Sequence, residues 1–133
     1  MILSFKSRFP NGSQTNFENN ICAGYKKHTI REDKTNRWKK GNKIHASVGV
    51  RTKDYRCFLQ MDCIEVQHIR MIWRAKKGLE VYVNARQLDS KAVDSLIEND
   101  GLAPTQFLEW FGFNELGDKE FTGKIIHWTN LKY

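Results

Sequence analysis

The fold is decided near the end of the chain, by residues 121–131, which read Phe-Thr-Gly-Lys-Ile-Ile-His-Trp-Thr-Asn-Leu. Apolar side chains fall at both odd and even positions of this stretch, so both faces of an extended segment carry apolar groups. Strands that are apolar on both faces are typically covered on both sides. We therefore predict that this segment is a central strand of a sheet or the strand that closes a barrel.

Further strands are indicated upstream by short apolar segments. In residues 43–50, Ile44, Ala46 and Val48 alternate with polar neighbours, which is the pattern of a half-buried strand. The other predicted strands cover residues 2–5, 55–66, 67–73 and 79–84. Several short strands at close spacing favour a small barrel. We predict about six strands, mostly antiparallel.

Helix signals flank these strands. Thr15, with Glu18 three residues later, has the spacing of a capping box for a short helix that ends before Gly24. Asp89 or Ser90 caps the first helix of a late pair, and the second helix follows soon after. The predicted fold class is therefore α+β, with an early helix and a late helical pair that cap the openings of the barrel.

Length and composition indicate one globular domain. The chain has 133 residues, of which 40% are hydrophobic, so we expect a single domain over residues 1–133 and not a disordered chain. No apolar run approaches the ~20 residues of a bilayer span, and residues 1–8 do not read as a signal peptide. We therefore expect a cytoplasmic protein with no membrane partner. Its oligomeric state is not predictable from the sequence, and we assume a monomer.

Charge and cysteine content restrict the partners. The chain carries 22 Lys and Arg against 15 Asp and Glu, a net charge of +7 that fits an anionic partner such as RNA or a nucleotide. The three cysteines lack C-x-x-C spacing, which argues against a disulfide framework or a structural zinc site. The four histidines are scattered without ligand spacing. We predict neither a metal nor another cofactor.

The densest candidate site is residues 25–31, Tyr-Lys-Lys-His-Thr-Ile-Arg, directly after Gly24. In a regular strand Lys26 and Thr29 point to opposite faces, so they converge only if the chain bends. A bend is expected where a helix gives way to a strand and a glycine permits a sharp turn. The alternative is a solvated basic strand without a function of its own.

Residues 21–31, Ile-Cys-Ala-Gly-Tyr-Lys-Lys-His-Thr-Ile-Arg, resemble the signature of ASCH domains, in which a helix ending in Ala-Gly-x-Lys is followed by Thr-Ile-Arg. Residues 38–44 resemble the aromatic-x-x-Gly-Asp-x-Ile that comes next in the family, with Asn42 in place of Asp, and residues 121–128 resemble its closing strand. The resemblance spans most of the chain. It implies a PUA-like fold, a small β-barrel beside a basic cleft, and RNA binding.

Within this family, the small bacterial amidohydrolases that deacetylate N(4)-acetylcytidine are most similar. The resemblance aligns Lys26 with their catalytic Lys, Thr29 with their Thr and Arg31 with the Arg that follows. Asp100 aligns with their catalytic Glu, although Asp is one methylene shorter, and Glu98 is the other candidate for this role. The chain is also longer than these enzymes, so its substrate is not fixed by the resemblance.

The residue types carried over by this resemblance suit amide hydrolysis. Thr29 would supply a nucleophilic hydroxyl, Lys26 would act as the base, and Asp100 or Glu98 would protonate the leaving amine. Lys26 can accept a proton only if its pKa falls, which burial and neighbouring cations promote. Arg31 could instead hold a carbonyl or a phosphate with its two-pronged guanidinium.

Other residues are candidates for contacting a ligand. Gly24, Lys27 and His28 belong to the same block, and His28 lies either in the pocket or in solvent. Trp38 stands among cations, as a stacking platform for a base does, although a tryptophan at the edge of the core is the alternative. Two hypotheses follow: a module that binds RNA or a nucleoside in a basic cleft, or an amidohydrolase. A third, an interaction domain, would expose a large apolar patch.

Overall fold

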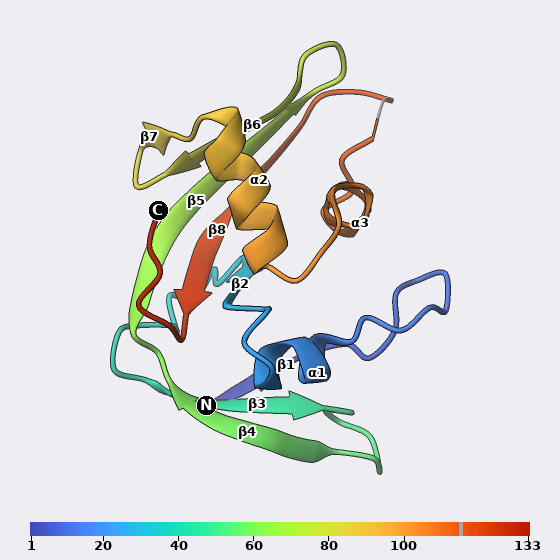
Figure 1. Cartoon of the computed structure of the whole chain (residues 1–133), viewed down its shortest axis with the longest axis vertical. Coiled ribbons are helices and arrows are strands. Elements are labelled where there is room, and N and C mark those ends of the chain that lie inside the picture. Colours follow the sequence, from blue (N-terminus) through green and yellow to red (C-terminus); the bar gives the residue numbers. More distant parts are fainter. Residues whose placement is uncertain (115) are drawn as a thin grey trace.

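The structure is a computed structural model that describes residues 1–114 and 116–133. In this part of the chain eight strands and three helices confirm the predicted α+β class (Figure 1). No described helix has the length and the apolar character needed to cross a membrane. The elements in chain order are β1 (Ile2–Ser4), α1 (Phe17–Cys22), β2 (His28–Arg31), β3 (Lys43–Val48), β4 (Arg56–Asp62), β5 (Glu65–Arg74), β6 (Gly78–Val83), β7 (Arg86–Gln87), α2 (Ser90–Asn99), α3 (Pro104–Trp110) and β8 (Lys119–His127).

The strands form two sheets, one in the order β1-β3-β4 and one in the order β2-β8-β5-β6-β7. Strand β8 lies between β2 and β5 and is antiparallel to both, so that Ile126 pairs with Thr29 on one side and with Val66 on the other. The prediction of a central strand is thus confirmed. The hydrogen bonding of the described residues leaves the two sheets separate and closes no barrel, and β1 pairs with β3 in parallel.

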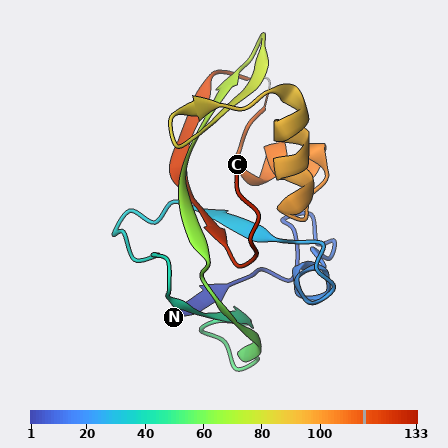
Figure 2. The ribbon, with the colours of Figure 1, turned by 60° about the vertical axis from the view of Figure 1, so that its left-hand side comes forward.

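The core of the five-stranded sheet depends on close approach between β2 and β8. Ile125 and Ile126 are fully buried. A Cβ added at Gly123 would stand 2.4 Å from the carbonyl oxygen of Arg31, so the backbones meet here because the residue has no side chain. Helices α2 and α3 lie on the same side of this sheet (Figure 2), and they bury Leu96 and Phe107 in the core.

The helix ends differ in how well their caps were predicted. Asp89 caps α2 as expected, because its side chain accepts a hydrogen bond from the amide of Ala92 at 2.8 Å. The capping box predicted from Thr15 and Glu18 is wrong. The backbone of Asn16 is left-handed, with φ of 57°, and makes Asn16 the N-cap, which leaves Thr15 outside the helix. Its hydroxyl donates to the carbonyl of Lys6 at 2.6 Å instead.

Candidate functional site

A cavity of about 140 Å³ lies where β1, β2, α1 and the end of α2 meet. Four polar residues predicted from the sequence line it together: Lys26, Thr29, Arg31 and Asp100. Three aromatic rings complete much of its wall: Phe5, Phe17 and Trp110. The remaining lining residues are Ser4, Lys6, Ile30 and Leu102. The four predicted side chains therefore converge on one hollow, although Lys26 and Asp100 are 74 residues apart in sequence.

A bend before β2 brings Lys26 to this cavity. Helix α1 ends at Cys22, and Gly24 follows it with a left-handed φ of +84°. The amide of Lys26 then donates to the carbonyl of Asn20 at 3.0 Å. Because β2 begins only at His28, Lys26 lies outside the strand. The rule that successive strand residues point to opposite faces therefore does not apply to Lys26. This is how Lys26 and Thr29 reach the same hollow.

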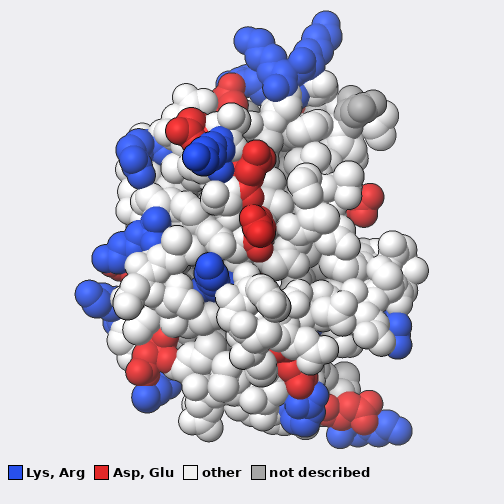
Figure 3. Space-filling view, in the orientation of Figure 1, with Lys and Arg blue, Asp and Glu red and all other residues white. Residues whose placement is uncertain are grey.

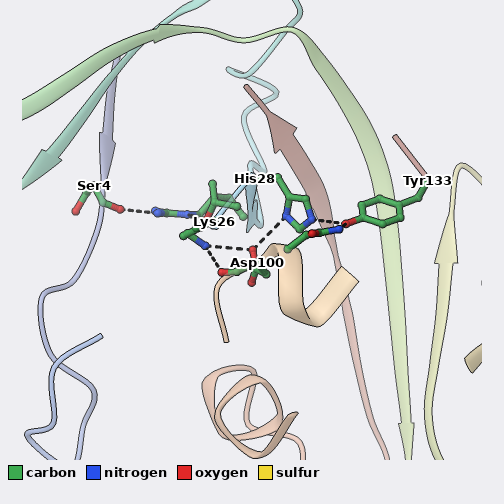
Figure 4. A network of polar contacts seen from close by, with 8 residues as sticks. Ser4, Lys26, His28, Asp100 and Tyr133 are labelled. Atoms are coloured by element: carbon green, nitrogen blue, oxygen red, sulfur yellow. Dashed lines mark hydrogen bonds and ion pairs between the residues drawn. The ribbon is translucent and has the colours of Figure 1, made fainter. Parts of the chain in front are cut away.

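The Lys26 amine is held at the end of α2 by Asp100 (Figure 4). Lys26 is 2% exposed, and its Nζ donates to the backbone oxygen of Asp100 at 2.5 Å and lies 3.3 Å from the Oδ1 of the same residue. The last carbonyls of a helix carry partial negative charge, which favours a cation at this position. Burial outweighs this attraction and lowers the pKa of Lys26, and the charge of Arg31 acts in the same direction.

Gly101 makes room for the stem of Lys26. Its φ of +81° ends α2 in the left-handed conformation that glycine adopts without strain. A Cβ built at Gly101 would lie 3.1 to 3.2 Å from three carbons of the Lys26 side chain. The absence of a side chain at 101 therefore helps to fix where the amine sits.

A buried chain of polar groups lies behind Asp100 (Figure 4). Asn99 Nδ2 donates to the Tyr133 hydroxyl at 3.0 Å, and this hydroxyl is 2.7 Å from Nε2 of His28. The hydroxyl can accept from Asn99 and donate its own proton to Nε2, and we assign it in this way, which places the proton of a neutral His28 on Nδ1. That Nδ1 lies 3.3 Å from Oδ1 of Asp100, too poorly aligned to form a hydrogen bond.

Burial keeps His28 neutral and within this chain of groups. The ring is fully buried, and desolvation lowers the pKa of His28 despite the nearby Asp100 carboxylate. His28 does not line the cavity. His28 is therefore neither a wall of the pocket nor a solvated ring: it stands behind the carboxylate, with its Nδ1 3.3 Å from Oδ1 of Asp100.

Arg31 spans the gap between the two sheets. Its Nε donates to the Thr29 hydroxyl at 3.2 Å, and its Nη2 donates to the carbonyl of Ser4 at 2.5 Å. The guanidinium also lies over the Phe5 ring, 5.2 Å from its centroid. Burial lowers the pKa of Arg31 to about 10, so it remains a cation at neutral pH.

The arrangement offers donors, acceptors and a base within one hollow. A neutral Lys26 amine has two N–H groups and a lone pair that can take a proton. The two N–H groups match the two oxygens beside it, the backbone oxygen and Oδ1 of Asp100. The Thr29 hydroxyl accepts from Arg31 and keeps its own proton to donate. Among the described side chains no hydrogen bond joins Lys26 to Thr29, so a proton passing between them needs the substrate or a water as a bridge.

Three other predicted residues do not line the cavity. Gly24 is exposed and serves the bend described above. Lys27 is half-buried, and its amide donates to the carbonyl of Asn99 at 2.7 Å, which ties the bend to α2. Glu98 is exposed on α2, so Asp100 is the acid that the fold brings to Lys26.

The expectation of an exposed stacking platform at Trp38 is wrong. Trp38 is 5% exposed and packs in the core. Its amide donates to Asp33 at 3.0 Å, and the same carboxylate lies 3.0 Å from the amine of Lys124. This ion pair holds the segment between β2 and β3 against the sheet. The alternative interpretation of Trp38, a tryptophan at the edge of the core, is therefore confirmed.

Several residues of the site carried no local signal in the sequence. Tyr133 lies 105 residues from its partner His28, and neither spacing nor periodicity relates the two. The Trp110 ring is half-buried at the wall of the cavity, and no motif in the sequence places it there. Nothing in the sequence indicates that the Phe17 ring lies 4.6 Å from the Lys26 amine.

Neither metal chemistry nor relatives add to this description. Within residues 1–114 and 116–133, no group of three or more His, Cys, Asp or Glu side chains could hold a metal ion. Comparison with protein-family models, with curated proteins and with solved structures finds no match for this chain.

Proposed function

We propose that this protein binds a nucleoside or nucleotide, free or within RNA, with the base in the cavity beside Lys26. The observation that carries the proposal is the convergence of Lys26, Thr29, Arg31 and Asp100 on one hollow walled by aromatic rings. Amine and guanidinium groups can donate to a ring carbonyl, and a carboxylate can accept from an exocyclic amine, as Asp does with cytosine.

The dimensions of the cavity favour one small ring. Its volume of about 140 Å³ is below the ~300–1,000 Å³ of pockets that enclose a drug-sized molecule. Phe5 and Phe17 provide apolar walls, and such rings favour planar, unstacked bases. A pyrimidine is the base that this space and these polar groups suit best.

The net charge is compatible with an anionic ligand, and Figure 3 shows how the charges are distributed on one face. The chain carries a net charge of +7. On the face shown in Figure 3, Lys and Arg lie mainly around the periphery with Asp and Glu among them, and the described residues form no continuous basic surface there. This distribution supports a local site more than a long RNA track on this face.

The proposal includes the family and the compartment inferred from the sequence. The resemblance to ASCH domains implies that the two sheets together make a PUA-like barrel wall with the cavity as its cleft. Lys26, Thr29 and Arg31 match the family motif and line the cavity, and Asp100 lies where the family has a Glu. This arrangement supports the assignment. The function is proposed to be cytoplasmic.

Calorimetric titration tests the binding proposal. We expect cytidine to bind more tightly than adenosine, because a purine exceeds the space. Lys26→Met should weaken cytidine binding at least ~10-fold, about the value of one charged hydrogen bond. Lys91→Met is the matched control, since Lys91 is exposed on α2 and away from the cavity. Absence of binding for every common nucleoside and its monophosphate would contradict the proposal.

A second candidate function is hydrolysis of an amide on the bound base. The specific observation in its favour is the burial of Lys26, which lowers the pKa of the amine beside a carboxylate and a hydroxyl. Thr29 Oγ would attack the amide carbon, and its proton would pass to the Lys26 amine. The C–N bond then breaks, the leaving nitrogen takes a proton from Lys26 through Asp100, and water releases the acyl group from Thr29.

Acetate release from N(4)-acetylcytidine tests this candidate. Thr29→Val keeps the branched shape of a residue that is 5% exposed but removes the hydroxyl. We expect it to lower turnover at least ~100-fold while cytidine binding stays within ~5-fold, and Thr29→Ser to retain turnover within ~10-fold. Equal acetate release by the wild type and Thr29→Val would exclude Thr29 as the nucleophile. No release by the wild type would leave the binding function alone.

A further inference from the structure

Three hollows meet around one side chain, Lys6. The cavity of the proposed function shares Lys6 and Phe17 with a hollow of about 300 Å³ beside α1. It shares Lys6 and Trp110 with another of about 430 Å³ that reaches Pro10. Lys6 therefore stands at the rim where a ligand seated beside Lys26 would leave the cavity.

The hollow beside α1 has the charge for an anion. Its lining includes three cations, Lys6, Arg8 and Arg56, against a single carboxylate. That carboxylate, Glu18, is already paired with Arg56 at 2.6 Å. The pairing leaves Lys6 and Arg8 as the cations in excess.

Neither of these two cations is neutralised by the described residues. Lys6 has no carboxylate within ion-pair distance in residues 1–114 and 116–133, and its amine lies 5.9 Å from the centroid of the Trp110 ring. Arg8 uses one Nη1 hydrogen bond, at 2.8 Å, on the carbonyl of Gly12 and has further N–H groups to offer. In the third hollow Glu109 offsets Lys6, so an anion is favoured beside α1 and not there.

We propose that the ligand carries a phosphate, held by Lys6 and Arg8 in the hollow beside α1, while its base lies beside Lys26. This inference rests on the proposed function and specifies its substrate class as nucleotide in place of free nucleoside. The inner cavity is too small for base and sugar together, so the sugar and its phosphate extend past the rim. Lys6 is the first cation they meet. The phosphate belongs to a mononucleotide or to an RNA chain.

The test compares cytidine with cytidine monophosphate at low salt, because only the phosphate differs. We expect the wild type to bind the monophosphate at least 10-fold more tightly than cytidine, and 0.5 M salt to reduce this preference. In Lys6→Met and in Arg8→Met the preference should fall below 3-fold. Arg8 does not line the inner cavity, so in Arg8→Met the affinity for cytidine itself should be unchanged. Both residues are exposed, so both variants are expected to fold, and Lys91→Met serves again as the control.

The outcomes separate this inference from the proposed function. Cytidine and its monophosphate binding equally well, or a preference that survives in Lys6→Met and in Arg8→Met, would overturn the phosphate site and leave the base site intact. If neither ligand binds, both proposals fall. A cytidine-containing trinucleotide distinguishes the sources: a further gain over the monophosphate that is lost in Lys6→Met supports RNA, and no gain supports a mononucleotide.

Discussion

Two lysines are buried against aspartates in this protein, and their surroundings differ. Lys26 lies 3.3 Å from Asp100, with side chains 2% and 5% exposed. Lys124 lies 3.0 Å from Asp33, with side chains 8% and 2% exposed. By burial and distance alone the two pairs are nearly equivalent.

The difference lies in what else the two pairs contact. The Asp33 carboxylate also accepts the amides of Arg37 and Trp38, and Asn36 accepts a hydrogen bond from the Lys124 amine. All these contacts of Asp33 and Lys124 hold the segment between β2 and β3 in place, and neither residue lines any of the cavities described above. The Lys26 amine faces a hollow with aromatic walls, and Asp100 is backed by a second buried polar chain. Of the two pairs, we therefore expect a function in ligand binding only for Lys26 and Asp100, which border space for a ligand.

The largest effect is expected from removing each lysine in turn. Lys26→Met leaves a buried carboxylate without its lysine partner and should lower the free energy of unfolding by about 3–5 kcal/mol in urea denaturation. Lys124→Met should lower it less, because the Asp33 carboxylate keeps its hydrogen bonds from the amides of Arg37 and Trp38. Only Lys26→Met should also weaken cytidine binding, by at least ~10-fold. A folded Lys124→Met protein that no longer binds, or a Lys26→Met protein that binds normally, would contradict the distinction between the two pairs.

Much of the region around Lys26 and its cavity could be predicted from the sequence. Strand 121–131, the α2 cap at Asp89 and the bend after Gly24 were recognisable, because each depends on neighbours in the chain. The convergence of Lys26, Thr29, Arg31 and Asp100 agrees with the positions that the resemblance to ASCH domains implied. What this convergence does chemically remains a prediction.

The other features could not be predicted because they arise from contacts between distant segments. Trp38 has the same cationic neighbours in sequence whether its ring is exposed or buried, and the ion pair of Asp33 with Lys124, 91 residues away, decides for burial. Tyr133 reaches His28 only after β8 is placed between β2 and β5. The parallel pairing of β1 with β3 likewise has no signature in periodicity.

A smaller effect on the free energy of unfolding is expected from lowering the pH, and it arises from the buried histidine rings behind Asp100. Burial lowers the pKa of His127 to about 4, its Nδ1 has no partner among the described groups, and its ring lies 5.3 Å from that of His28. The unfolded chain takes up the proton near pH 6.5 and the folded chain only near pH 4. Stability is therefore complete above pH 6.5 and falls by ~3 kcal/mol as the pH drops to 4.

Urea denaturation between pH 7.5 and 4 measures this loss. His127→Asn should make the decline shallower, because one of the two buried rings is gone while burial still lowers the pKa of His28. His68→Asn, at an exposed position of β5, should retain the wild-type profile. If the free energy of unfolding of the wild type did not decline between pH 6.5 and 4, the rings would take up protons as readily in the folded protein as in the unfolded chain. This result would contradict the prediction.

The smallest effect, and the finest test of how the Lys26 amine is positioned, comes from two glycines with nearly the same backbone. Gly24 and Gly101 have φ of +84° and +81°, so alanine at either position costs about 1 kcal/mol or more in backbone strain. A Cβ at 24 meets nothing within 4 Å, whereas a Cβ at 101 lies 3.1 Å from the Cβ of Lys26. Gly24→Ala should therefore lose stability alone, and Gly101→Ala should also move the amine.

Thermal unfolding and cytidine titration of the two variants separate these contributions. We expect Gly24→Ala to bind within ~2-fold of the wild type and Gly101→Ala to bind ~5- to 10-fold more weakly, since a shifted amine loses part of one charged hydrogen bond. Equal affinities for the two variants would mean that the cavity tolerates displacement of Lys26. The amine would then attract the ligand by its charge without a precise hydrogen bond. The difference between Lys26 and Lys124 in ligand binding would then depend only on the cavity beside Lys26, and not on how Lys26 and Asp100 are placed relative to each other.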